Sequence, residues 1–134
     1  MNKAYNWYSQ LIKPPWAPPG WLFGPVWTVL YIIIVLSFGK VFLSAWQNQI
    51  ALIVAVPFVL NLVFNFSFTY LQFGLKNNLL AAIDVLLVLI TLVWALAVIY
   101  PVIPWVAYAN IPYLLWVMFA ATLQLAVTYL NRKV

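Results

Sequence analysis

Three long runs without a charged residue constrain this chain more than any other feature of its sequence. They extend over residues 14–39, 41–75 and 85–131. A helix that crosses a bilayer needs about 20 mostly apolar residues, so each run is long enough for at least one crossing. Hydrophobic residues make up 68% of the chain and charged residues only 5%. Charged residues approach about a quarter of a typical soluble domain. The sequence therefore predicts an integral membrane protein.

Polar turns and prolines divide these runs into candidate spans. Gln47–Gln49 and the segment 74–78 are typical of turns, and Pro101 and Pro104 interrupt an apolar stretch that is too long for one helix. The predicted fold is an all-α membrane protein, a bundle of four transmembrane helices in a single domain over residues 1–134. A loop rich in proline and tryptophan, residues 1–24, precedes the bundle. We expect the spans at residues 25–44, 50–73, 79–100 and 111–130.

The composition excludes several classes of function. The chain has no cysteine, no histidine and only one acidic residue, Asp84. Thiol nucleophiles, imidazole bases, paired carboxylates and Cys/His metal sites are therefore absent from the sequence. The six basic residues are too few and too scattered for a nucleic-acid interface. We assign no catalytic residue, no metal site and no required cofactor, and the sequence favours a binding protein over an enzyme.

The lysines and arginines predict the orientation of the bundle. With four spans both termini lie on the same side, and this side carries all but one of the basic residues: Lys3, Lys13, Lys76, Arg132 and Lys133. The other side has only Lys40. Because positive charges are enriched in cytoplasmic loops, we expect both termini in the cytoplasm. The protein would then lie in a bacterial inner membrane or a photosynthetic membrane.

The segment 7–21 is dense in aromatic residues and prolines. Proline fixes φ and biases the preceding residue towards extended geometry, so the segment is expected to be a stiff loop. Two interpretations remain open. The loop is an interfacial aromatic belt that anchors the first span, or it is a preorganised lid over the mouth of the bundle.

Polar and aromatic residues inside the spans predict a candidate cavity. Asn61 and Asn65 are four residues apart and share a helix face, which must point into the bundle because an amide facing lipid would lack partners. Such residues serve either to join helices or to line a site. A flat, mainly apolar cavity with a few hydrogen-bond donors is predicted near Trp27, Tyr31, Asn61, Asn65, Trp116, Ala120 and either Leu123 or Gln124. Packing of the aromatic side chains in a core is the alternative for each tryptophan.

Asp84 falls about one turn into the third span. A carboxylate at membrane depth is a candidate for a functional site. The simpler interpretation places it near the interface, where it meets Lys76 or Asn77 or caps local backbone. A proton relay is disfavoured because the sequence offers no chain of titratable neighbours.

Several motifs together resemble the TspO/MBR family, the tryptophan-rich sensory proteins and translocator proteins. They follow the family's order and spacing over nearly the whole chain: Trp7-Tyr8, Lys13-Pro14, Trp16, Pro18-Pro19, the run 23–31 (FGPVWTVLY), Asn65, Phe73-Gly74, Ala82-Ile83-Asp84, the run 112–116 (PYLLW) and Phe119-Ala120. The resemblance implies binding of tetrapyrroles such as porphyrin or haem. It also implies a sensory, regulatory or transport role in the membrane.

The resemblance also implies a set of ligand-binding residues. Trp27 and Trp116 resemble the pocket tryptophans of the family. The other lining positions are expected at Tyr8, Pro18, Asn61, Asn65, Phe68, Ala120 and Leu123. Phe68 stands where relatives usually have tryptophan, which removes one indole donor.

Family members have a further helix before the tryptophan-proline loop, whereas Trp7 lies only six residues after Met1 here. The resemblance therefore implies a shortened form. We expect a second copy, a larger membrane complex or lipid to cover the face that this helix would occupy. Two alternatives to a tetrapyrrole-binding protein stay open: an accessory subunit of a larger complex, including one that contains pigments, and a light-dependent porphyrin-degrading activity.

Overall fold

The computed structural model describes residues 14–17, 20–75 and 77–131. Tyr8 and Pro18, two of the predicted site residues, lie outside them. The described chain folds into four long helices, one short helix and two single turns. In chain order these are the 3₁₀ turn η1 (Gly20–Leu22), α2 (Phe23–Trp46), α3 (Leu52–Thr69), the π-helical turn η2 (Tyr70–Gly74), α4 (Asn78–Ile99), α5 (Pro104–Ala109) and α6 (Ile111–Leu130).

The four long helices confirm the predicted all-α fold. Three of them, α2, α4 and α6, are long and apolar enough to cross a membrane, and the apolar stretch of α3, Leu52–Phe68, is shorter. The turn η2 continues α3 to Gly74 with π-helical geometry, so the helical segment ends close to the predicted residue 73. The predicted polar turn at 47–49 is present, and Asn48 adopts a left-handed φ of 60° there. Asparagine tolerates this conformation better than most residues.

The segment 101–110 is not simply an interruption between two spans. Pro104 begins the six-residue helix α5, where proline is favoured because its missing N–H would have no helical partner. Asn110 then joins α5 to α6, and its side-chain Nδ2 donates to Ser37 Oγ of α2 at 2.9 Å and to Val106 O at 2.8 Å. This connection ties the middle of α2 to the junction of α5 and α6.

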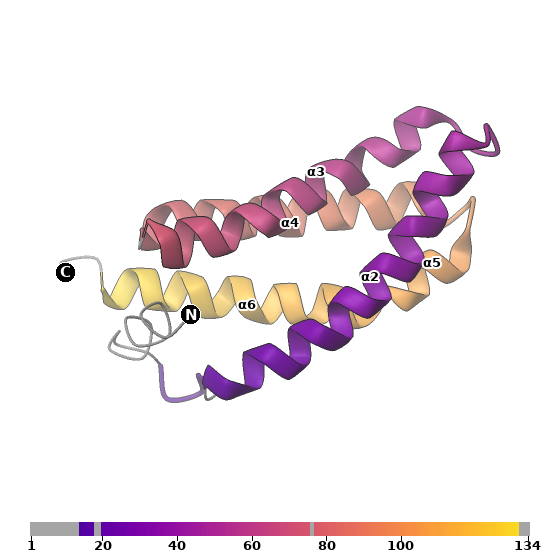
Figure 1. Cartoon of the computed structure of the whole chain (residues 1–134). Coiled ribbons are helices and arrows are strands. Elements are labelled where there is room, and N and C mark those ends of the chain that lie inside the picture. The colour runs from indigo at the N-terminus through magenta and orange to yellow at the C-terminus, as the bar shows by residue number, and fades with distance from the viewer. Residues whose placement is uncertain (1–13, 18–19, 76, 132–134) are drawn as a thin grey trace.

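The helices α3, α4 and α6 lie side by side, and α2 leans obliquely across them (Figure 1). The most extensive contact is between α3 and α4, followed by that between α4 and α6. The beginning of α2 and the end of α6 lie at the same end of the molecule.

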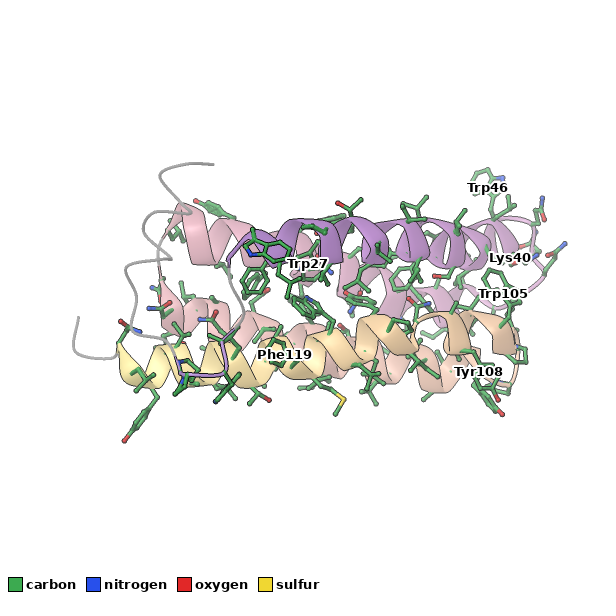
Figure 2. The ribbon with its side chains drawn as sticks, turned by 90° about the horizontal axis from the view of Figure 1, so that it is seen from below. Trp27, Lys40, Trp46, Trp105, Tyr108 and Phe119 are labelled. Atoms are coloured by element: carbon green, nitrogen blue, oxygen red, sulfur yellow. The ribbon has the colours of Figure 1, made fainter. Side chains whose placement is uncertain are left out.

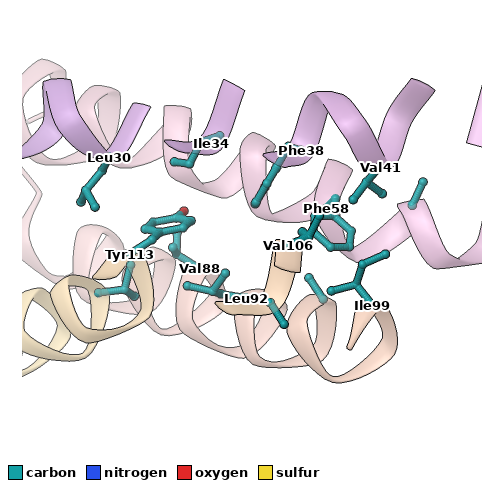
Figure 3. Close-up of a cluster of buried hydrophobic side chains, with 14 of the residues drawn as sticks. Leu30, Ile34, Phe38, Val41, Phe58, Val88, Leu92, Ile99, Val106 and Tyr113 are labelled. Atoms are coloured by element: carbon teal, nitrogen blue, oxygen red, sulfur yellow. The ribbon is translucent and has the colours of Figure 1, made fainter. Parts of the chain in front are cut away.

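The apolar core lies where α2 crosses the other helices (Figure 3). Phe38 of α2 packs edge-to-face on Phe58 of α3, with ring centroids 4.8 Å apart and an interplanar angle of 87°. Aliphatic side chains from all four long helices and from α5 complete the cluster, including Leu30, Ile34, Val41, Val88, Leu92, Ile99, Val106 and Val117.

The distribution of polarity matches a protein surrounded by lipid. Among the described residues, many large apolar side chains are exposed, whereas several polar side chains are buried: Ser37, Ser44, Asn61, Asn65, Asp84, Thr91, Asn110, Gln124 and Asn131. Without water, buried polar groups need partners inside the bundle. Together with the long apolar helices, this pattern identifies an integral membrane protein.

Candidate functional site

The first part of the candidate site is an aromatic contact between α2 and α6. Trp27 packs against Tyr31, one turn later on α2, with ring centroids 5.4 Å apart. It also meets Tyr113 of α6 edge-on at 6.4 Å. Figure 2 shows Trp27 on α2 well away from the end of the bundle that carries Trp46, Trp105 and Tyr108. The two predicted α2 residues therefore line one side of the same cluster.

The second part surrounds Trp116, one turn after Tyr113 on α6. Its ring lies 5.8 Å from that of Phe23 at the start of α2 and 5.5 Å from that of Phe119. Trp16, from the segment before α2, packs edge-on against Phe119 at 5.8 Å. The indole Nε1 of Trp116 is buried and has no hydrogen-bond partner among the described residues. Because a buried donor without a partner is costly, this N–H is a natural contact for an oxygen atom of a ligand.

A continuous hydrogen-bond chain runs beneath these rings. The Tyr31 hydroxyl donates to Asn65 Oδ1 at 3.1 Å, and Asn65 Nδ2 donates to the Tyr113 hydroxyl at 2.6 Å. Tyr113 in turn donates to Asn61 Oδ1 at 2.9 Å. Asn61 Nδ2 then donates to the backbone carbonyl of Val88 at 3.0 Å. These hydrogen bonds thus join α2, α3, α6 and α4. Each side chain in the series donates to the next group.

This chain confirms that the face carrying Asn61 and Asn65 points into the bundle. The two asparagines are 0% and 4% exposed. They join helices, which is one of the two roles that the sequence left open. The same bonds hold Tyr31 and Tyr113 in place against Trp27, so the polar chain also orients the aromatic wall.

The remaining predicted residues lie nearby on α6 and α3 or outside the described residues. Leu123 is buried and lies two turns after Trp116 on the same face of α6, and Ala120, one turn after Trp116, is half-buried. Phe68 is half-buried on α3, three residues after Asn65. No ring contact among the described residues joins Phe68 to Trp27 or Trp116.

Sequence reasoning missed the residue at the centre of the site. Tyr113 is 0% exposed and connects both asparagines with Trp27. Its position three residues before Trp116 was a usable signal, because such pairs share a helix face. Phe23, Phe119 and Trp16 were also missed as members of the cluster. They belong to the quoted motifs, but only packing shows that they surround Trp116.

Asp84 lies apart from this cluster, in the second turn of α4. Asn77 caps α4 instead of meeting the carboxylate, because its Oδ1 accepts from Leu80 N at 2.9 Å. Lys76 lies outside the described residues. Within the described part of the chain, no group of three or more His, Cys, Asp or Glu side chains comes together that could hold a metal ion. The arrangement offers aromatic stacking and one unpaired donor, which suits a flat apolar molecule that carries an oxygen acceptor.

Comparison with known proteins identifies the family of this chain. The model of the TspO/MBR family matches residues 1–130. The Tryptophan-rich protein TspO of Chlorobaculum tepidum is 33% identical over 130 residues, which cover 96% of this chain and 82% of that protein. Its counterpart in Archaeoglobus fulgidus is 36% identical over 132 residues, covering 97% and 83%. The human Translocator protein is 32% identical over 134 residues, covering 94% and 75%. The chain is therefore a member of the TspO/MBR family of membrane proteins.

Proposed function

We propose that this protein binds a tetrapyrrole, or a similar flat amphipathic molecule, between the aromatic walls of α2 and α6. The observation that carries the proposal is the buried, unpartnered Nε1 of Trp116 inside an aromatic cluster. A porphyrin supplies a flat apolar ring for stacking and carboxylate oxygens that accept hydrogen bonds. Both features match what the cluster offers.

The hydrogen-bond chain supports a preorganised site. Tyr31 and Tyr113 are fixed by Asn65 and Asn61 before any ligand arrives. Side chains that are already ordered lose less conformational entropy when a ligand binds. We assign this binding to a sensory or transport role, with both termini in the cytoplasm as the distribution of lysine and arginine predicts.

The outer face of α2 is apolar and is available for contact in an assembled state. Ile32, Val35 and Leu36 are exposed on this face and are 57–68% accessible. Lipid, a second copy of the chain or a larger membrane complex would each bury this apolar surface. We propose a homo-oligomer or a larger complex in the membrane.

A titration tests the proposed site. Purified protein in detergent is titrated with protoporphyrin IX, and binding is followed by tryptophan fluorescence and by the absorbance of the porphyrin. Trp116→Phe keeps an aromatic ring but removes the indole donor. A hydrogen bond to a charged acceptor contributes about 1.5–3 kcal/mol, so we expect affinity to fall by about tenfold or more.

The matched control is Trp105→Phe, because Trp105 is half exposed at the far end of the bundle (Figure 2). This variant should bind like the wild type. Saturable binding that is unchanged in Trp116→Phe would refute the assigned pocket, and wild-type protein that does not saturate would refute the function. Consumption of more than one equivalent of porphyrin under illumination would instead favour the enzymatic alternative.

A further inference from the structure

Asp84 is the one acidic residue of the chain, and its side chain is deeply buried. It is only 4% exposed, and its Oδ2 has no hydrogen-bond partner among the described residues. It lies six residues after Asn78, the first residue of α4, which places it about 9 Å along the helix from that end. A carboxylate in such a position is costly unless a cation or a set of donors meets it.

Asp84 is one of the residues that line an open hollow on the side of the bundle. This hollow, of about 490 Å³, lies where the end of α3 and the turn η2 pass the beginning of α4. Its other walls are mainly apolar and aromatic, and include Val63, Phe66 and Tyr70. Phe66 and Tyr70 are 62% and 57% exposed, so the hollow is open to the surroundings of the bundle and not to its core.

An exposed apolar stripe leads away from the hollow along α3. Val56, Val59, Val63 and Phe66 follow a spacing of three and four residues, which places them on one helix face. All four are exposed. On a helix in a membrane this face meets acyl chains, so an apolar tail lies naturally along it.

We propose that this hollow binds an amphiphilic primary amine from the membrane, with its ammonium against Asp84 and its alkyl tail along the α3 stripe. The ammonium supplies hydrogen-bond donors to the Asp84 side chain, and the aromatic side chains of Phe66 and Tyr70 line the same hollow. The exposed apolar stripe on α3 provides the surface along which the alkyl tail of the amine lies. A zwitterionic phospholipid amine is disfavoured because its phosphate would bring a second negative charge towards the carboxylate. A metal ion is disfavoured because the hollow presents a single carboxylate among mainly apolar walls.

Photocrosslinking tests this site directly. The full chain is reconstituted in nanodiscs of phosphatidylcholine and exposed to dodecylamine that carries a diazirine close to the amino group. Mass spectrometry then locates the label. We expect labelling of residues 63–71 in the wild type, retained in Asp84→Glu and reduced by about tenfold or more in Asp84→Asn, because loss of a charge-assisted contact changes affinity on this scale.

A matched neutral probe keeps the test independent of any variant's folding. The N-acetylated form of the same probe has the same tail and no charge, and it should not label residues 63–71 in the wild type. Tyr70→Leu removes one aromatic wall at an exposed position and should reduce labelling by the amine severalfold. Equal labelling by both probes, or equal labelling of wild type and folded Asp84→Asn, would overturn the proposal.

Two further arms exclude other sources of the ammonium. If wild type is not labelled but Lys76→Ala is, the protein's own lysine fills the site and the proposal fails. If phosphatidylethanolamine in the nanodisc suppresses labelling as strongly as unlabelled dodecylamine at the same mole fraction, a lipid headgroup is the occupant and the proposal of a free amine is wrong. These outcomes do not depend on porphyrin binding at Trp116.

Discussion

Replacing Tyr113 with phenylalanine removes the hydroxyl at the centre of the interhelical hydrogen-bond chain. The hydroxyl is fully buried, donates to Asn61 Oδ1 at 2.9 Å and accepts from Asn65 Nδ2 at 2.6 Å. The aromatic ring, and with it most of the packing against Trp27 and Phe38, remains. The variant therefore reports on two hydrogen bonds with little change in side-chain volume.

The expected loss of stability follows from these two bonds. Interhelical hydrogen bonds in membrane proteins average about 0.6 kcal/mol and reach about 1.7 kcal/mol each. Because both partners of Tyr113 stay buried, we expect values towards the upper end, and a total decrease of about 2–3 kcal/mol in the free energy of unfolding. Tyr31→Phe removes only one bond, at a half-buried position, and should cost about half as much.

Unfolding in mixed micelles with increasing sodium dodecyl sulfate, followed by circular dichroism, measures these differences. Tyr108→Phe is the control, because its hydroxyl is exposed and, among the described residues, pairs only with the exposed Tyr100 hydroxyl at 3.2 Å. This variant should stay within about 0.5 kcal/mol of the wild type. If Tyr113→Phe is no less stable than Tyr108→Phe, the polar chain does not hold the helices together and the reasoning is refuted.

Three further predictions test other parts of the account. Trp27→Phe should weaken porphyrin binding severalfold, because part of an aromatic contact of about 0.5–1.5 kcal/mol is lost; unchanged affinity in the same titration would remove Trp27 from the site. Asn110→Ala should lower the free energy of unfolding by about 1–2 kcal/mol, since it loses the bond to Ser37 that anchors α2; a neutral result would contradict this role. A reporter fused to the C-terminus should be active only in the cytoplasm, and periplasmic activity would reverse the predicted orientation.

Hydropathy was sufficient to predict the long helices, because a helix that crosses a bilayer needs about 20 mostly apolar residues. The last span was predicted at residues 111–130, and α6 occupies Ile111–Leu130. The third was predicted one residue late at each end relative to α4. The turn η2 was not predictable, since nothing in the local sequence distinguishes π-helical from α-helical hydrogen bonding at Tyr70–Gly74. The short helix α5 was missed because two prolines indicated only an interruption.

Only part of the composition of the candidate site was predictable, and its connections were not. The burial of Asn61 and Asn65 followed from the cost of exposing an amide to lipid. Their partners depend on how α6 packs against α3, and this packing brings the Tyr113 hydroxyl between them. The unpaired Nε1 of Trp116 is likewise a property of the assembled bundle, because the sequence alone does not show which indole N–H groups lack a hydrogen-bond partner.

The central claim is that this protein binds a flat amphipathic molecule in the membrane. Gentle detergent extraction from its native membrane, followed by mass spectrometry of every protein and pigment that travels with the chain, tests this claim most directly. We predict that the protein emerges with a tetrapyrrole or a similar flat ligand, and that Trp116→Phe carries less of it. Recovery in a fixed ratio with a larger complex and without any such ligand would contradict the account and favour a structural subunit.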